Sequence, residues 1–456
     1  MYPEELMLLA MIGILLLFIF IGVPIAFAIA GTGLLVTCLC LICNTWFETD
    51  FFADFNNLGL IVNRLYSLMD NNLLVALPMF IFMGIMLEKS GIAENLMESF
   101  QKIFKNFRGG LAIAVTLIGL LLAASTGIVG ASVVLLSVMA LPTMLKSGYS
   151  KELSCGTICS AGCLGILIPP SIMLILIADQ LSVSLGDLFN GALIPGLILT
   201  ASYCIYIYLK AEKITKEEAP EKLTSDDLKK LFKAIIPPVL LMLLVLGSIF
   251  FGIATPTEAS GLGALGALLL AVANKKLTRQ NLRQSVLQTG LTTSFILAIL
   301  LGAACFSLTL KELEGDEIIR ANIGALPLGT NGIIIVILGM IFLLGFILDW
   351  IEITLVLLPI VAPILGHLDT GIVMTGVEKP ELIWFSILVA VTLQTSFLTP
   401  PVGFALFYMK GVTPPEISMK NICKGVIPFI ILQIVVLILI FIFPKLVLWL
   451  PSQGSY

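Results

Sequence analysis

The chain has 456 residues, of which 59% are hydrophobic and only 12% are charged, and its mean hydropathy is +1.09. A soluble globular domain is about 45–50% apolar and about 25% charged, so this composition excludes one and predicts a protein that crosses a membrane many times. The net charge of −4 is too small and too dilute to indicate a nucleic-acid partner. No long polar linker interrupts the apolar sequence, so residues 1–456 are expected to form a single membrane domain.

A spanning helix needs about 20 apolar residues, because each residue of an α-helix rises about 1.5 Å. Apolar segments of this kind predict an all-α polytopic membrane protein with about ten transmembrane helices. The ten predicted crossings lie at residues 4–21, 25–44, 72–88, 156–178, 188–209, 234–253, 259–274, 286–310, 383–409 and 422–448.

Two further apolar runs do not fit as single or double crossings. Residues 110–145 are interrupted at 125–127, and residues 331–366 are interrupted at 349–352. Each flank is about 15 helical residues long, which is shorter than the roughly 30 Å hydrocarbon core. We therefore interpret both runs as re-entrant helical hairpins whose tips meet near the membrane centre, where non-helical backbone is tolerated only inside protein or beside water.

The distribution of basic residues supports this layout. With the N-terminus outside, ten crossings and two hairpins place 20 of the 25 Lys and Arg residues on the cytoplasmic side, as the positive-inside rule requires. Both termini are then predicted to be periplasmic, and Trp46, Trp384 and Trp449 lie at the outer interface. The five basic residues left outside are Arg64, Lys311, Arg320, Lys379 and Lys445.

The predicted elements repeat in the same order. A helix, a connecting arm, a hairpin and two crossings follow one another over residues 72–209, and again over residues 286–448. The first hairpin enters from the inside and the second from the outside. This pattern is an inverted-topology repeat, which is typical of secondary transporters.

Two Pro-Pro pairs lie inside predicted crossings, at residues 169–170 and 400–401. Proline lacks the backbone N–H and clashes with the preceding turn, so each pair is expected to break its helix and free carbonyl oxygens that suit sodium. A structural kink is the alternative, but equivalent positions in two repeats favour a functional break. The polar or small neighbours are Gly162, Gly165 and Ser171 in the first repeat, and Gln394, Thr395, Ser396, Thr399 and Gly403 in the second.

The hairpin tips are expected to complete the site. Ser125, Thr126 and Gly127 offer hydroxyls and helix ends whose amides attract anions. Asp349 stands at the opposite tip, where a carboxylate costs about 2.5–3.5 kcal/mol on insertion scales, so it is expected to serve a cation or a hydrogen bond. A helix N-cap is the alternative role, and both roles are compatible. Glu352 falls on the same capping turn.

Other chemistries have little support in the sequence. The dipeptide Gly-Lys is absent, so there is no Walker A loop and no sign of ATP use. The only histidine, His367, has no partnered nucleophile, so the chain is not expected to be an enzyme. Three cysteines recur on one helical face and predict packing rather than a metal site. An ion channel and a self-sufficient sodium/anion symporter of similar inverted-hairpin design remain as alternatives. The three cysteines are Cys155, Cys159 and Cys163.

At these motifs the sequence resembles the large permease subunit of tripartite ATP-independent periplasmic (TRAP) transporters. The segments that carry the resemblance are "LPMFIFMGIMLEKSGIA" (77–93), "AASTGIVGASVV" (123–134), "GTICSAGCLGILIPPSI" (156–172), "GIATPTEASGLGAL" (252–265), "GFILDWIEITLVLLPIVAPIL" (345–365) and "TLQTSFLTPPVGFALFYMKGV" (392–412). They span nearly the whole chain.

The resemblance implies a sodium-driven importer of a small organic acid, either a carboxylate or a sulfonate, in the bacterial inner membrane. It implies an elevator mechanism, a soluble periplasmic substrate-binding protein that delivers the substrate, and a small four-helix membrane subunit as a separate chain. The moving part is then expected at about 110–187 and 331–421, and the scaffold at about 1–109, 188–330 and 422–456.

The resemblance also implies where ions and substrate bind. Sodium sites in the family lie between each hairpin tip and the neighbouring broken helix. Trp350 departs from the smaller residue expected beside Asp349, so the ligand set of the second site is the less defined one. Carried over to this sequence, the sodium ligands are Ser125, Thr126, Gly127, Gly165 and Pro169 at the first site, and Asp349, Thr395, Thr399 and Pro400 at the second; Ser125, Ser171, Ser396 and Gly403 are candidates to face the substrate.

Overall fold

All regular structure in the described residues is helical. The structure is a computed structural model, and it describes residues 3–47, 51, 59–104, 107–126, 129–211, 225–324, 327–366, 368 and 370–454. The predicted interruption at Gly127 and the single histidine, His367, lie outside these residues.

Ten helices of the described chain are long and apolar enough to span a membrane. Nine of them correspond to predicted crossings, which confirms a multi-pass helical membrane protein. The tenth is α8, which the sequence predicts as a hairpin arm, while the predicted crossing 156–178 is a broken pair of short helices. The ten candidate spans are Pro3–Ile21 (α1), Ile25–Trp46 (within α2, Ile25–Phe47), Asn72–Lys89 (α5), Val129–Lys146 (α8), Leu185–Lys210 (α11), Lys229–Phe250 (within α12, Ser225–Phe250), Pro256–Ala273 (α13), Arg279–Glu312 (α14), Pro380–Leu398 (α18) and Met419–Ile442 (α20).

The remaining helices are short and connect or interrupt the spans. One of them, α4, lies between α2 and α5, where no element is predicted. A second, α15, forms in the stretch predicted as a polar connector. The short helices are α4 (Leu60–Met69), α6 (Ile92–Phe104), α7 (Gly110–Thr126), α9 (Lys151–Cys163), η1 (Leu164–Ile166), α10 (Ile172–Leu181), α15 (Gly315–Gly324), α16 (Thr330–Leu344), α17 (Trp350–Leu365), α19 (Phe404–Val412), α21 (Lys445–Leu448) and η2 (Pro451–Gln453).

The repeated order of elements is present in the structure. The first series has a long helix (α5), a short helix (α6), a pair of helices (α7–α8), a broken helix (α9–α10) and a second long helix (α11). The same series recurs as α14, α15, α16–α17, α18–α19 and α20. Both breaks occur at the predicted Pro-Pro pairs, and the Pro169-Pro170 and Pro400-Pro401 bonds are both cis.

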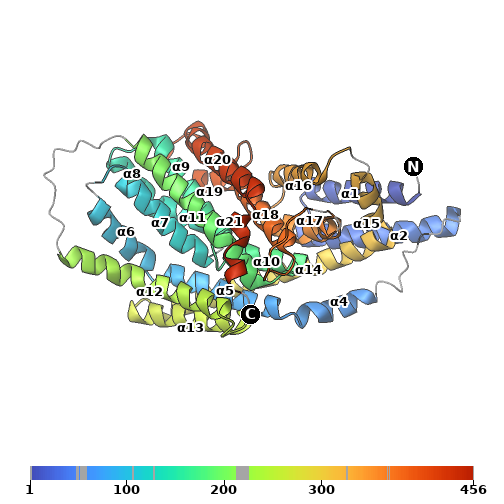
Figure 1. Cartoon of the computed structure of the whole chain (residues 1–456), viewed down its shortest axis with the longest axis horizontal. Coiled ribbons are helices and arrows are strands. Elements are labelled where there is room, and N and C mark those ends of the chain that lie inside the picture. The colour runs from blue at the N-terminus through green and yellow to red at the C-terminus, as the bar shows by residue number, and fades with distance from the viewer. Residues whose placement is uncertain are drawn as a thin grey trace.

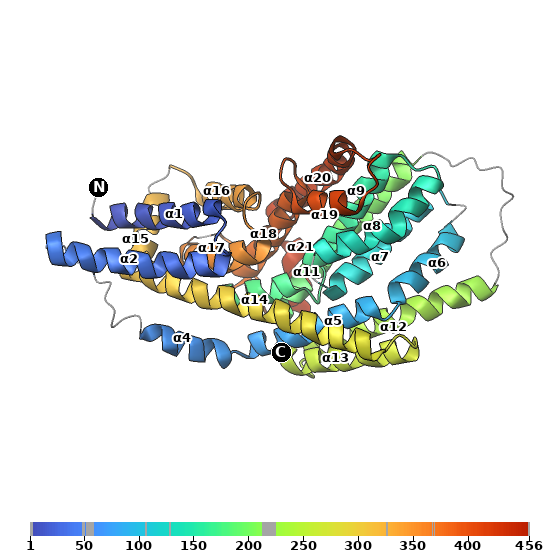
Figure 2. The same ribbon diagram turned by 180° about the vertical axis from the view of Figure 1, so that it is seen from behind.

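The helices form one elongated molecule in which α14, the longest helix, runs along one side (Figures 1 and 2). Helix α2 packs along α14, and α13 packs along α5, so these four helices make a continuous layer. The broken helices and the two helix pairs lie on the other side of this layer. Contacts between α5 and α7, and between α14 and α17, join the two parts.

Helices α11 and α20 pack with the broken helices. Helix α20 lies against α9 and α18, and α11 lies against α7 and α18. The predicted scaffold boundaries at residues 188 and 422 assign both helices to the scaffold. The division between scaffold and moving part stays a prediction, but in this conformation the two helices belong to the packing of the broken-helix side.

Small residues permit the closest of these contacts. A Cβ atom on Gly156 of α9 would lie 2.1 Å from the carbonyl oxygen of Gly425 on α20, and one on Gly425 would lie 2.1 Å from the Glu152 carbonyl oxygen. The two backbones therefore touch directly. Beside this crossing, Asn421 Nδ2 donates to Glu152 Oε1 at 2.6 Å, and that hydrogen bond lowers the pKa of the Glu152 carboxyl.

One predicted interface anchor is inside the protein. Trp384 is only 2% exposed, and its indole N–H donates to the Ile440 carbonyl oxygen at 2.9 Å. Trp46 and Trp449 are 79% and 54% exposed, as anchors at a membrane surface should be. The sequence predicted all three tryptophans at the outer interface because it shows how far along a crossing each one lies. It does not show which side of the helix faces lipid. The three cysteines at 155, 159 and 163 are fully buried, which confirms their packing role.

We predict that Gly156→Ala lowers the thermal stability of the purified protein, because the added methyl group forces α9 and α20 apart at a cost of about 1–3 kcal/mol. The matched control is Gly247→Ala on α12, where a Cβ meets nothing within 4 Å. That change should leave stability unchanged or raise it by about 0.5–1 kcal/mol. Thermal melts of both variants in one detergent make the comparison, and equal stabilities would contradict the close crossing.

Candidate functional site

The first break separates α9 from α10. Pro169 has no N–H, so it cannot donate to Gly165 four residues earlier, and the hydrogen bonds of the turn go instead to the carbonyl oxygens of Leu164 and Ile166. The Ile166 oxygen accepts from the Ser171 hydroxyl at 2.7 Å. The Gly165 carbonyl is thereby left available in a fully buried segment, as the sequence predicts.

Ser171 lies just before α10 and is fully buried. Because the Ser171 hydroxyl donates its hydrogen bond to the Ile166 carbonyl oxygen, only its oxygen lone pairs remain to contact a ligand. A hydroxyl in this state suits a cation or an N–H donor better than it suits a carboxylate. Its placement beside the break is as predicted, whereas a substrate-facing role stays a prediction.

The second break separates α18 from α19. Thr395 Oγ1 donates to the Val391 carbonyl and Thr399 Oγ1 donates to the Thr395 carbonyl, each at 2.7 Å. Both hydroxyls therefore present only lone pairs, which is the donor set a sodium ion needs. Pro400 and Pro401 follow immediately, and α19 begins at Phe404. No hydrogen bond joins Asp349 to either threonine in the described part of the chain.

Gly403 shapes the same turn. A Cβ atom there would lie 2.8 Å from the Phe397 carbonyl oxygen and 3.0 Å from that of Thr399. Its own N–H donates to the Thr399 carbonyl at 3.0 Å. The absence of a side chain thus allows the backbone to fold tightly around the end of α18, whatever the residue contributes to substrate binding.

The second helix pair rests on this broken helix. Ser396 Oγ donates to the Phe342 carbonyl on α16 at 2.9 Å, and a Cβ on Gly345 would clash with the Ser396 side chain. Ser396 is fully buried, so in this conformation it joins the tip of the pair to α18 rather than facing an open space. The second helix pair and α18 are therefore in contact, while a re-entrant hairpin stays a prediction.

Asp349 is the N-cap of α17. It forms a capping box with Glu352, whose Oε2 accepts from the Asp349 N–H at 3.1 Å. The capping role that the sequence offered as an alternative is therefore confirmed, while the ion-binding role stays a prediction. The interruption lies at residues 345–349, earlier than the predicted 349–352, because this capping box draws Trp350, Ile351 and Glu352 into the helix.

The first tip is described only in part. Ser125 and Thr126 are the last residues of α7, and α7 contacts η1, which contains Gly165. Just beyond the tip, a Cβ on Gly130 of α8 would lie 2.8 Å from the ring of Tyr408 on α19. Tyr408 therefore joins α19 of the second repeat to α8 of the first.

Two buried polar side chains, one on α18 and one on α17, lack hydrogen-bond partners in the described chain. The amide of Gln394 is fully buried, and neither its nitrogen nor its oxygen has a hydrogen-bond partner in the described chain. The hydroxyl of Thr354 on α17 is in the same state. Such groups cost about 1–3 kcal/mol each unless a ligand or water satisfies them. Sequence analysis missed Thr354, although a lone polar residue in an apolar helix was a usable signal, and it missed Tyr408, for which no local signal exists.

The fold is that of a multi-span helical membrane transporter. A solved structure of the YdaH transporter from Alcanivorax borkumensis superposes on 86% of this chain and 90% of its own, with a TM-score of 0.60 at 14% sequence identity. This likeness establishes the fold alone.

The family follows from the sequence comparisons. The family model described as "Tripartite ATP-independent periplasmic transporter, DctM component" matches residues 12–446, so the chain belongs to the DctM family of TRAP transporter large permeases. The C4-dicarboxylate TRAP transporter large permease protein DctM of Pseudomonas aeruginosa is 28% identical over 85% of this chain and 88% of its own. The ectoine/5-hydroxyectoine large permease UehC of Ruegeria pomeroyi is 27% identical over 83% and 85%. The predicted family is confirmed, and with it a membrane transporter.

We predict that Gly130→Ala and Tyr408→Ala are coupled, because the alanine at 130 needs the space that the ring occupies. Each single variant should lower thermal stability, while the double variant should lose less than the sum, with a coupling of about 0.5–3 kcal/mol. Tyr208 on α11 supplies the control pair, since Gly130→Ala combined with Tyr208→Ala should be additive. If the stability losses of Gly130→Ala and Tyr408→Ala were additive, the contact between Gly130 and the Tyr408 ring would be contradicted.

Proposed function

We propose that the chain is the transporting subunit of a sodium-coupled importer that takes up a small organic acid across the bacterial inner membrane, with both termini periplasmic. The observation that carries the proposal is the matched pair of broken helices, with the free Gly165 carbonyl and the Ser171 lone pairs at the first break and the Thr395 and Thr399 lone pairs at the second. Neutral oxygens of this kind select sodium over protons, because proton carriers need titratable groups along the path.

The substrate class rests on two supports. The similar proteins are named for C4-dicarboxylates and for ectoine, both of which carry a carboxylate. The described site has helix N-termini and unpartnered amide and hydroxyl groups near the breaks, and these can hold an acid together with bound sodium. A small carboxylate fits this chemistry, and so does a sulfonate.

The proposed sodium ligands are those carried over from the family. At the first site they are Ser125, Thr126, Gly127, Gly165 and Pro169, and at the second they are Asp349, Thr395, Thr399 and Pro400. The proposed substrate contacts are Ser125, Ser171, Ser396 and Gly403. For Ser171 and Ser396 to donate to a carboxylate, their hydrogen bonds to the Ile166 and Phe342 carbonyl oxygens must open during the transport movement.

The proposed motion is an elevator movement of the two helix pairs and the broken helices against the layer of α2, α14, α5 and α13. The two parts meet where α5 contacts α7 and where α14 contacts α17, so the proposed movement must slide at these contacts. The family name describes one component of a tripartite transporter. We propose that the other two are a small four-helix membrane subunit, which braces the layer, and a periplasmic binding protein, which delivers the substrate.

Sodium coupling is tested by uptake into proteoliposomes that contain the full complex. An inward sodium gradient should drive accumulation of the acid, whereas a proton gradient in sodium-free buffer should not, because all the proposed ion ligands except Asp349 are neutral oxygens that do not titrate. Equal uptake under the two gradients would refute sodium coupling. A current in the absence of binding protein would favour a channel instead.

Asp349→Asn tests the second ion site. Asparagine is an equally good N-cap, so α17 should keep its start, while the negative charge near the ion is lost. We expect uptake to fall about tenfold or more, as the loss of a charged contact implies, with assembly and thermal stability preserved. The control is Glu317→Gln, which removes an exposed charge from the first turn of α15. Wild-type uptake by the Asp349 variant would remove this residue from the site.

A further inference from the structure

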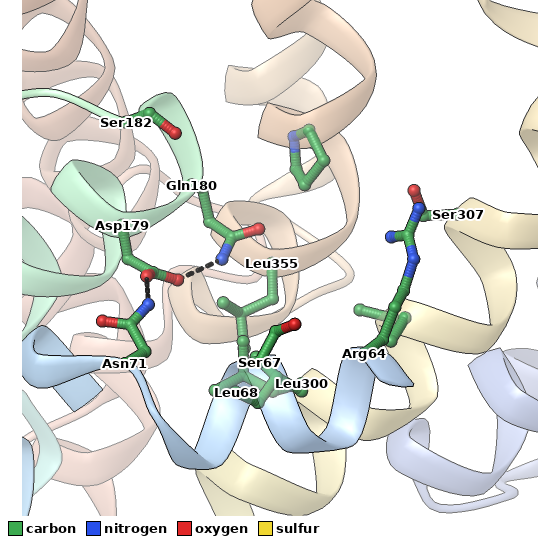
Figure 3. Close-up of a pocket in the computed structure, with 13 residues that line it drawn as sticks. Arg64, Ser67, Leu68, Asn71, Asp179, Gln180, Ser182, Leu300, Ser307 and Leu355 are labelled. Carbon is green, nitrogen blue, oxygen red and sulfur yellow. Dashed lines mark hydrogen bonds between the residues drawn. The ribbon is translucent and has the colours of Figure 1, made fainter. Parts of the chain in front are cut away.

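A polar cavity of about 450 Å³ lies away from the breaks, at the seam between the two parts of the molecule. One wall comes from α4, the start of α5 and α14, and the other comes from α10 and α17 (Figure 3). Its volume is within the range of small-molecule sites, about 300–1,000 Å³. In the predicted orientation it opens toward the periplasm, because α4 follows the second crossing and precedes the third.

Arg64 on α4 supplies the positive charge of this cavity. Its side chain is half-buried and extends from α4 toward Ser307 on α14 (Figure 3). No hydrogen bond or ion pair engages Arg64 within the described ranges, and the same holds for the Ser307 hydroxyl. A guanidinium has five N–H donors in a fork that matches a carboxylate. Arg64 and Ser307 are therefore free donors on one wall of an open cavity.

The one acidic residue of the lining is already partnered. Asn71 Nδ2 donates to Asp179 Oδ1, and Gln180 Nε2 donates to Asp179 Oδ2 at 2.7 Å (Figure 3). Asn71 also caps α5, since its Oδ1 accepts from the Leu73 N–H at 2.9 Å. Each Asp179 oxygen thus has an amide donor, and Arg64 is the charged lining residue that remains without a partner in the described chain.

The cavity is joined to the breaks by two short helices. Helix α10 begins after Ser171 and ends at the cavity wall, and α17 begins after Asp349 and contributes Leu355 to the same wall. The ten residues of α10 span about 15 Å. An anion in the cavity would therefore lie about one short helix away from the proposed midplane site, which contains no lysine or arginine.

We propose that this cavity is an outer carboxylate-binding site in which Arg64 and Ser307 receive the substrate anion before it moves to the midplane. The proposal rests on the proposed function for its place in the transport path, but the binding itself does not require it. Arg64 binds the carboxylate through its N–H fork, and Ser307 donates its hydroxyl proton. A site between the layer and the moving part would lose its shape when the parts slide, which would release the anion inward.

The test measures whether a carboxylate covers Arg64. The full complex in proteoliposomes is treated with phenylglyoxal, which modifies arginine, in sodium-free potassium buffer of constant ionic strength. The rate of Arg64 modification is followed by peptide mass spectrometry with succinate or with its uncharged diamide. Succinate should slow the modification roughly fivefold because a bound carboxylate covers the guanidinium donors, and the diamide should not. Arg279 and Arg283 are exposed at the other end of α14 and should react equally in both arms.

Equal rates at Arg64 with succinate and diamide would overturn the proposal, and so would equal slowing at Arg279 and Arg283. Ser307→Ala should weaken the protection of Arg64, whereas Ser202→Ala on α11, whose hydroxyl donates to the Leu199 carbonyl, should not. Full protection in the Ser307 variant would remove that residue from the site. The assay uses neither sodium nor uptake, so a negative result would contradict the outer site without contradicting the proposed function. Likewise, a failure of sodium-driven uptake would not change what the Arg64 modification rates say about anion binding.

Discussion

Every backbone N–H and C=O group inside a bilayer must find its partner within the protein, because hydrocarbon offers none. This constraint makes the described chain helical throughout and allows a helix to break only where protein surrounds it. Both breaks obey it. The turn after η1 is fully buried among other helices, and α18 is buried from Leu382 to Leu398, just before the chain turns at Thr399. A carbonyl freed at these points faces protein and not lipid, so a bound ion or water can satisfy it.

The same enclosure explains why the site and the packing are inseparable. Close backbone contact at Gly156 and Gly425 holds α20 against α9, and Gly119 brings α7 to Ala161 of α9, where a Cβ would lie 2.7 Å away. These contacts surround the first break with helices. Tyr408 makes the corresponding contact between the repeats, since its ring on α19 lies against Gly130 of α8. The polar groups left unsatisfied, such as Gln394, lie inside this packing and not on the surface.

Much of the architecture was predictable because helix length and proline position act locally. Both Pro-Pro breaks, nine of ten candidate spans and the repeated order of elements follow from runs of apolar residues and from the missing N–H of proline. The start of α17 was less predictable. The sequence marked 349–352 as irregular because charges interrupt an apolar run, whereas the capping box between Asp349 and Glu352 makes those residues the beginning of a helix.

The sequence by itself determined the membrane class, the element order, the location of both breaks and the family, because each depends on residue type and spacing along the chain. Only the tertiary structure decided which side chains are enclosed and which meet. Trp384 donates a hydrogen bond to Ile440 instead of facing lipid, and Ser396 donates one to Phe342. Arg64 and Asp179, which are 115 residues apart in the sequence, line the same cavity. Such pairings depend on how helices distant in sequence rotate and cross, and periodicity within one helix carries no information about its neighbour.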